Sequence, residues 1–89
     1  MQAILHKLAK KYLNKQTADK QEQIRAAIKD LEKEPPKGDI RPYAGNPGIL
    51  RLVVGNHRLL FKYEDNYILV SHIEPRGQAY TKKTRNKRG

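Results

Sequence analysis

The chain has no cysteine, no tryptophan and few acidic residues, and these shortages exclude whole classes of protein. Its 89 residues include 9 Asp and Glu against 19 Lys and Arg. Without cysteine there is no disulfide scaffold, thiol redox motif or cysteine-based zinc site, and a reduced cytoplasm is the expected location. No apolar run approaches the ~20 residues of a membrane span, so we expect no membrane partner. A chain this short is predicted to form one domain with a small core.

The basic excess is concentrated near the C-terminus. Residues 1–75 carry 13 basic and 9 acidic side chains, whereas residues 76–89 carry 6 basic side chains and no acidic one. Such an excess favours a polyanionic partner: RNA, DNA, a ribosome or an acidic protein. The alternative is a solvated tail that only aids solubility. Residues 81–89 lack apolar periodicity and are predicted to form a basic, flexible tail.

Two apolar stripes at helical spacing occupy the first third of the chain. The first stripe contains Leu5, Leu8, Ala9, Tyr12 and Leu13. It predicts a helix, although residues 3–5 could instead pair as a strand before a shorter helix that begins near Lys7. A second helix is expected after Thr17, which is a suitable N-cap, and it must end before Pro35. The two helices would form a hairpin.

Three strand-like runs follow a loop that is rich in proline and glycine. The loop covers residues 35–48, and the runs cover residues 49–54, 57–64 and 67–73. Two-residue turns separate the runs, and the first turn is a Gly-Asn dipeptide that is typical of β-hairpins. The runs predict an antiparallel meander. With the helices, this is an α+β fold in which a helical hairpin packs on a mainly antiparallel twisted β-sheet.

The two short turns fix which residues lie opposite each other and share a face. The face predicted to be covered by the helices contains Leu50, Leu52, Val54, His57, Leu59, Phe61, Tyr63, Ile68, Val70 and His72. The other face contains Ile49, Arg51, Val53, Arg58, Leu60, Lys62, Leu69, Ser71 and Ile73. Here Ile73 is expected opposite Arg58, and Arg58 is the diagonal neighbour of Arg51. Because like charges this close repel unless an anion binds them, the register predicts a phosphate or nucleotide site. Ordinary arginines on a wet sheet face are the alternative.

Three stretches of the chain carry patterned glycine, arginine and tyrosine. They read GDIRPY at residues 38–43, GILRLVVGNHRLLF at residues 48–61 and IEPRGQAY at residues 73–80. Together they resemble the RelE/ParE superfamily of toxins. The resemblance implies a single RelE-like toxin domain at residues 1–80. It also implies an N-terminal short strand at residues 2–6, added to the helical hairpin and the mainly antiparallel sheet.

The function implied by the resemblance depends on the branch of the superfamily. RelE toxins cleave mRNA in the ribosomal A site without a metal or other cofactor, whereas ParE toxins poison DNA gyrase. The match at Arg58, Arg76 and Tyr80 favours the RelE branch. The implied partners are mRNA, the 70S ribosome and an acidic, RelB-like antitoxin that inhibits the toxin. A ParE-type gyrase inhibitor and a non-catalytic RNA- or ribosome-binding domain stay as alternatives.

Four residues are predicted to carry the chemistry: Arg51, Arg58, Arg76 and Tyr80. The planar guanidinium of an arginine matches two phosphate oxygens and keeps its charge, which suits it to stabilise a phosphorane. Arg76 could stabilise the same charge or assist the leaving group. Tyr80 is a candidate base or a stacking partner for a nucleobase, with a packing anchor as the alternative.

The remaining site predictions concern binding. The expected RNA contacts are Lys62, His57, Lys82, Lys83 and Arg85. His57 and His72 are expected to be diagonal neighbours at the end of the sheet. Two histidines without nearby carboxylates are weak grounds for a metal site, which usually has three or four ligands, so none is predicted.

Overall fold

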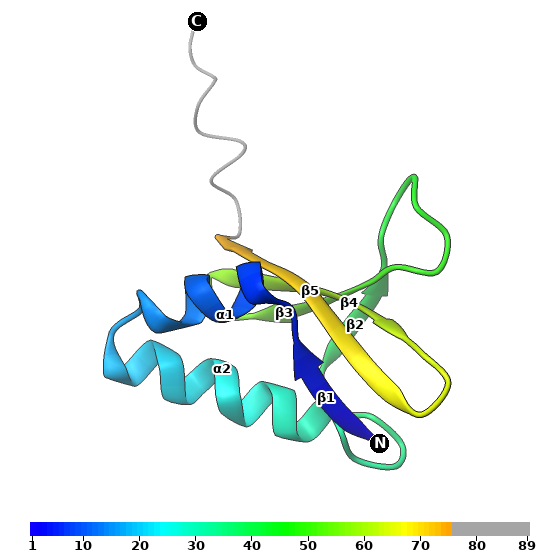
Figure 1. Ribbon diagram of the computed structural model, residues 1–89, viewed down its shortest axis with the longest axis horizontal. Coiled ribbons are helices and arrows are strands. Elements are labelled where there is room, and N and C mark those ends of the chain that lie inside the picture. The colour runs from blue at the N-terminus through cyan, green and yellow to red at the C-terminus, as the bar shows by residue number, and fades with distance from the viewer. Residues whose placement is uncertain (76–89) are drawn as a thin grey trace, which may run out of the picture.

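The structure, a computed structural model, describes residues 1–75 as one β-sheet covered by two helices (Figure 1). The elements are β1 (Gln2–Leu5), α1 (Lys7–Asn14), α2 (Ala18–Leu31), β2 (Asp39–Pro42), β3 (Leu50–Val54), β4 (His57–Tyr63) and β5 (Tyr67–Pro75). The strand order is β1-β5-β4-β3-β2. Only β1 runs parallel to its neighbour, β5, and the other pairs in this part of the chain are antiparallel. The predicted α+β architecture is therefore confirmed.

The N-terminal segment divides at His6 into a strand and a short helix. The backbone of His6 is extended, and its Nδ1 accepts a hydrogen bond of 3.2 Å from the amide of Leu8, which caps α1. Of the two possibilities that the sequence left open, a strand before a shorter helix is confirmed. A helix that begins at Lys7 buries Ala9 and Leu13. Leu8, which we expected in the buried stripe, is 53% exposed.

The second helix begins and ends where the sequence predicts. The side chain of Thr17 accepts a hydrogen bond from the amide of Lys20, and this satisfies one of the free amides at the start of α2. The helix buries Ile24, Ile28 and Leu31 against the sheet. These residues recur at the three- and four-residue spacing of one helix face, so α2 contributes a single apolar stripe to the core.

Part of the predicted loop is a strand. Residues 39–42 form β2, which pairs with β3 at the edge of the sheet. Its four residues are too few to show a clear alternation, and its proline is tolerated because it ends an edge strand. Gly38 precedes β2 with a φ of +132°, and a Cβ atom there would lie 2.6 Å from a methyl group of Leu52. Glycine at this position therefore lets β2 approach the core closely.

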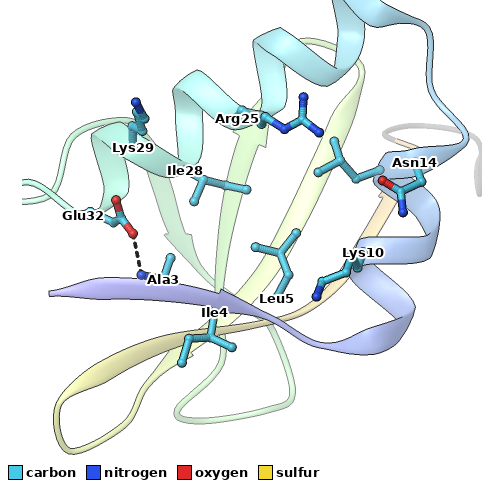
Figure 2. Close-up of a pocket in the computed structure, with 10 residues that line it drawn as sticks. Ala3, Ile4, Leu5, Lys10, Asn14, Arg25, Ile28, Lys29 and Glu32 are labelled. Carbon is cyan, nitrogen blue, oxygen red and sulfur yellow. Dashed lines mark hydrogen bonds between the residues drawn. The ribbon is translucent and has the colours of Figure 1, made fainter.

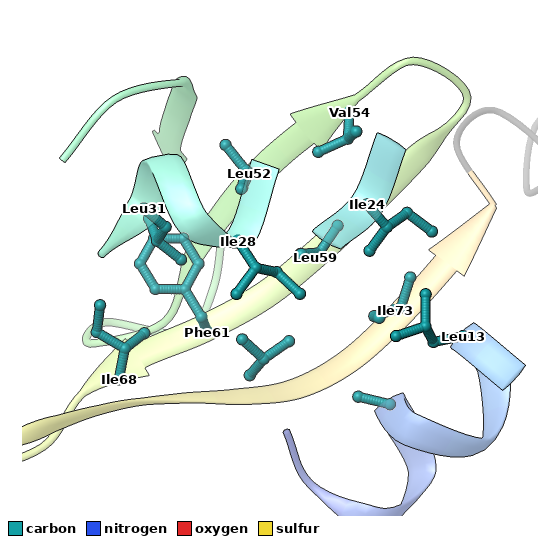
Figure 3. Close-up of a cluster of buried hydrophobic side chains, with 12 residues drawn as sticks. Leu13, Ile24, Ile28, Leu31, Leu52, Val54, Leu59, Phe61, Ile68 and Ile73 are labelled. Carbon is teal, nitrogen blue, oxygen red and sulfur yellow. The ribbon is translucent and has the colours of Figure 1, made fainter. Parts of the chain in front are cut away.

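The core lies between the helices and one face of the sheet (Figure 3). Its buried residues are Ala9, Leu13, Ile24, Ile28, Leu31, Leu52, Val54, Leu59, Phe61, Ile68, Val70 and Ile73. Phe61 is the largest side chain that is fully buried. Tyr63, expected in this core, is instead 44% exposed at the end of β4. No helix within residues 1–75 is long and apolar enough to cross a membrane.

A β-bulge in the second hairpin changes the predicted register. Lys62 lies opposite Leu69 as expected, but the pairing shifts between Phe61 and Leu60, and Ser71 has no opposite residue. The hydroxyl of Ser71 donates a hydrogen bond of 3.2 Å to the carbonyl of Leu60, which fastens the bulge. One extra residue reverses the direction of every side chain that follows it in the strand. The predicted faces are therefore wrong for all of β5 beyond Ser71.

Two residues exchange faces because of the bulge. Ile73, expected on the open side, lies opposite Leu59 and is 6% exposed in the core. His72, expected in the core, lies opposite Leu60 and is exposed. His72 and His57 therefore lie on opposite faces, and the expected histidine pair does not exist.

Candidate functional site

The sheet face that points away from the helices is rich in charged side chains, and we call it the open face. Following the register across β2 to β5, its residues are Asp39, Arg41, Arg51, Val53, Arg58, Leu60, Lys62, Leu69, His72 and Glu74. The first hairpin has the predicted register, with Arg51 opposite Leu60 and Val53 opposite Arg58. Arg51 and Arg58 are therefore diagonal neighbours on one face, as expected.

Arg58 already has an anionic partner within the chain. The bulge brings Glu74, rather than the expected Ile73, opposite Arg58, and the two side chains form an ion pair of 2.5 Å. The side chain of Arg58 is only 14% exposed. Arg51 and Arg58 therefore need less negative charge from an external anion than the predicted register implied. Glu74 supplies part of the negative charge.

Two further cations of the open face have carboxylate partners two residues away along the chain. Nε of Arg41 lies 2.9 Å from Asp39, and Nζ of Lys62 lies 3.2 Å from Glu64. Both pairs are largely accessible to solvent, so each contributes little to stability and can exchange for another anion at small cost. Lys62, a predicted RNA contact, is on the open face as expected.

Arg51 differs from the other cations of this face. It forms no ion pair within residues 1–75. Its Nε, like that of Arg58, is inaccessible to solvent and has no hydrogen-bond partner there. Arg41 lies directly opposite Arg51 on the neighbouring strand. Asp39 already neutralises part of the charge of Arg41, and a bound anion with several oxygens would supply the charge that Arg51 lacks. The sequence did not reveal Arg41, because β2 was expected to be a loop.

His57 lies on the helix-covered face, away from the arginines. Its side chain is 4% exposed, and its Nδ1 forms a hydrogen bond of 2.9 Å with the hydroxyl of Tyr12. The two rings meet edge to face with centroids 5.8 Å apart. Burial, and to a lesser extent the charge of Lys20, lowers the pKa of His57. The structure therefore ties His57 to α1, and this placement argues against the predicted contact with RNA.

The buried His57 makes the stability of the protein sensitive to acid. Because its pKa is lower in the folded chain than in the unfolded one, the unfolded chain takes up the proton first as the pH falls. We expect the free energy of unfolding to decrease from about pH 7 to about pH 5.5, below the usual histidine value. Urea denaturation at both pH values measures this. His57→Gln should flatten the dependence, and His6→Asn, which keeps a capping side chain, should retain it. An equal slope in all three proteins would contradict this account.

Five predicted site residues lie outside the residues that the structure describes. They are Arg76, Tyr80, Lys82, Lys83 and Arg85. The same holds for the predicted tail at residues 81–89 and for the end of the predicted domain at residue 80. Their roles stay predictions. Within residues 1–75 there is no group of three or more side chains suited to hold a metal ion.

A second surface feature lies on the helical side of the molecule. It is a groove of about 630 Å³ between β1, α1 and α2, and Figure 2 shows Leu5 and Ile28 facing each other across it. Its cations are Lys10, Arg25 and Lys29. Its one carboxylate, that of Glu32, accepts a hydrogen bond of 2.6 Å from the amide of Ala3. An apolar floor with a cationic rim suits an acidic amphipathic segment of another protein.

The fold is shared with toxins that have been crystallised with their antitoxins. The archaeal RelE–RelB complex from Pyrococcus horikoshii OT3 contains a chain that superposes with a TM-score of 0.70 at 23% identity, over 86% of this chain and 96% of that one. The RelB–RelE antitoxin–toxin complex from Methanococcus jannaschii gives a TM-score of 0.70 at 20% identity, over 86% and 94% of the two chains. At such identities the likeness shows the fold.

The sequence itself identifies the family. No curated protein sequence shows significant similarity to the chain. A family model described as the ParE toxin of the type II toxin–antitoxin system parDE, however, matches residues 1–80. That match covers both helices, all strands of the sheet and the closing arginine and tyrosine. The chain is therefore a member of the ParE toxin family, within the RelE/ParE superfamily, and is the toxin of a type II toxin–antitoxin system.

Proposed function

We propose that this toxin acts as a ribosome-dependent endoribonuclease that cleaves mRNA in the ribosomal A site. The observation that carries the proposal is the environment of Arg51 on the open face. Arg51 has no carboxylate partner within residues 1–75, and a second arginine, Arg41, lies opposite it. A phosphodiester would supply the counter-charge that Arg51 lacks, and its oxygens would also reach the guanidinium group of Arg41, which Asp39 neutralises only in part.

The reaction proposed is attack of a ribose 2′-hydroxyl on the adjacent phosphate. Three tasks follow: deprotonation of the hydroxyl, stabilisation of the charge that grows on the phosphate oxygens, and protonation of the leaving 5′-oxygen. Arg51 and Arg41 stand where they can hold the phosphate oxygens. Arg58, held in one orientation by Glu74, lies on the diagonal. Arg76 and Tyr80 would complete the site from the segment after β5.

The remaining basic residues would hold the toxin on the ribosome. Residues 76–89 add 6 positive charges with no acidic residue. Each lysine or arginine that neutralises a phosphate adds affinity that falls as salt is raised. On this proposal Lys82, Lys83 and Arg85 bind RNA without taking part in the chemistry.

The partner in the cell would be an acidic antitoxin. The fold relatives were crystallised as toxin–antitoxin complexes. The groove on the helical side fits such a partner by charge, since Lys10, Arg25 and Lys29 line it. Co-purification with the product of a small acidic reading frame beside the gene would support this, and a basic product would count against it.

Inhibition of DNA gyrase is the second candidate function, and the match to the ParE family model favours it. That function needs a protein-binding surface and no phosphoryl-transfer chemistry. Under the gyrase function, the arginines of the open face would not act together in one site.

Expression of the toxin in a bacterial host separates the two candidates. Sequencing of mRNA 5′ ends should show new ends clustered within codons that occupied the ribosomal A site. Gyrase–DNA breaks, measured in the same cells, should stay at the background level. Intact mRNA with accumulating breaks would establish the gyrase function instead. Intact mRNA without gyrase–DNA breaks and without growth arrest would argue against both candidate functions.

A further inference from the structure

The bulge at Ser71 places a histidine on the open face. His72 lies opposite Leu60, and Leu60 lies opposite Arg51, so these three residues form one row across β5, β4 and β3. Neighbouring strands are ~4.8 Å apart, which puts the Cα atoms of His72 and Arg51 about 10 Å from each other. Their side chains project from the same side of the sheet, and Leu60, only 8% exposed, forms an apolar floor between them.

The charged and polar groups near His72 come from its own strand and from three neighbouring segments. On its own strand, Glu74 projects to the same face two residues further on, where it is paired with Arg58 of β4. Arg51 contributes a positive charge from β3. On the other side of β5, the amide of His6 donates a hydrogen bond of 2.9 Å to the carbonyl of Val70, and Lys7 follows it at the start of α1. Of these charges, Arg51 lies in the same row as His72 and has no ion-pair partner within residues 1–75, so it is the cation available to a phosphate bound beside the imidazole.

Among the acidic and imidazole groups of this face, His72 is the one left free within residues 1–75. Asp39 is paired with Arg41, Glu64 with Lys62, and Glu74 with Arg58. The oxygens of these carboxylates are therefore already engaged by cations. His72 is exposed and has no hydrogen bond or ion pair with the described residues. Imidazole is also the side chain best suited to exchange protons near neutral pH.

We propose that His72 is the general base of the cleavage reaction, an inference that depends on the proposed ribonuclease function. Its imidazole takes the proton of the 2′-hydroxyl while the 2′-oxygen forms a bond to phosphorus. The bond from phosphorus to the 5′-oxygen breaks, and its electron pair stays on that oxygen, which takes a proton from water. The imidazolium then returns its proton to solvent. The products are a 2′,3′-cyclic phosphate and a free 5′-hydroxyl.

Single-turnover cleavage of a defined mRNA on programmed 70S ribosomes tests the role of His72. Three proteins are compared between pH 5.5 and 8.5: the wild type, His72→Ala and the matched control His6→Asn. We expect His72→Ala to cleave about 10² times more slowly. The toxin concentration that gives half of the maximal rate should stay the same. The wild-type rate should fall toward acidic pH, and the rate of His72→Ala should not. Imidazole added to the buffer should restore part of the lost rate, which a purely structural role would not allow.

The outcomes separate this inference from the function on which it depends. Cleavage by His72→Ala at the wild-type rate and with the wild-type pH profile would overturn the role of His72 alone. A slow His72→Ala that imidazole does not rescue and whose pH profile matches the wild type would also overturn it. No cleavage by the wild type would overturn the ribonuclease proposal itself. If His6→Asn slows cleavage as much as His72→Ala does, the effect comes from a disturbance of the strand β5, which His6 contacts, and not from the imidazole of His72. This result would also count against the inference.

Discussion

Replacement of Ile73 by alanine should lower the free energy of unfolding by about 2–5 kcal/mol, the usual cost of emptying a buried isoleucine site. Ile73 is 6% exposed and belongs to the core between the helices and the sheet. Without the bulge at Ser71 it would lie on the open face, where the same substitution costs almost nothing. For a domain of this size the loss is a large part of the total stability. Urea denaturation monitored by circular dichroism measures the change.

The adjacent residue supplies the control for the bulge. His72 is exposed on the opposite face, so His72→Ala should change the free energy of unfolding by no more than about 0.5 kcal/mol. The two substitutions differ by one position in the strand and should differ several-fold in effect. The reverse order, with His72→Ala costly and Ile73→Ala neutral, would show that the hairpin has a plain register. In that case, His72 and Glu74 would not lie on the open face.

Replacement of Arg51 by alanine should lower the rate of mRNA cleavage by about 10²–10³-fold, the usual cost of losing a preorganised donor to a developing oxyanion. Arg51 lies on β3, an interior strand of the sheet, its Nε is inaccessible to solvent, and Arg41 lies opposite it. Arg51→Lys should recover only part of the activity, because an ammonium keeps the charge but not the planar pair of donors. Single-turnover cleavage on programmed ribosomes measures both variants.

Arg25→Ala is the matched control for Arg51. It removes the same charge from the groove on the helical side, so net charge changes equally in the two variants. We expect Arg25→Ala to cleave like the wild type. Circular dichroism should show that Arg51→Ala is folded, since its guanidinium makes no ion pair within residues 1–75. Equal losses in the two variants would mean that the arginines act only through net charge and not through a site on the open face.

The first hairpin could be predicted residue by residue, because a Gly-Asn turn leaves one register for its strands. Gly55 has a φ of +55°, as such a turn requires, and Val54 lies opposite His57. This register was sufficient to place Arg51 and Arg58 on one face. The long apolar stripe of α2 and its Thr17 cap were equally clear, since both follow from local chemistry.

The bulge was not predicted, although the sequence contains a sign of it. Along β5 the buried residues are Ile68, Val70 and then Ile73. The spacing changes from two residues to three, which shifts the alternation by one position. A bulge has no turn dipeptide to mark it, and a regular strand was the simpler expectation. The Arg58–Glu74 ion pair and the exposure of His72 both followed from this one residue.

Arg41 was missed for a different reason. Residues 35–48 contain four prolines and three glycines, and that composition masks a strand of four residues. Pairing with β3, rather than any local preference, makes β2 a strand. Tertiary context of this kind cannot be read from a short window of sequence. The partner of Arg51 on the open face therefore became visible only in the folded chain.

The chemical nature of the RNA ends tests the central claim most directly, that the open face of this toxin cleaves mRNA by attack of the 2′-hydroxyl. The measurement uses purified toxin, programmed 70S ribosomes and a labelled mRNA, with mass spectrometry of the two fragments. We predict one cut in the A-site codon, a 2′,3′-cyclic phosphate on the upstream fragment and a 5′-hydroxyl on the downstream fragment. A 5′-phosphate would mean that water is the nucleophile, and an intact message would mean that this fold carries a different activity; either result would contradict the account.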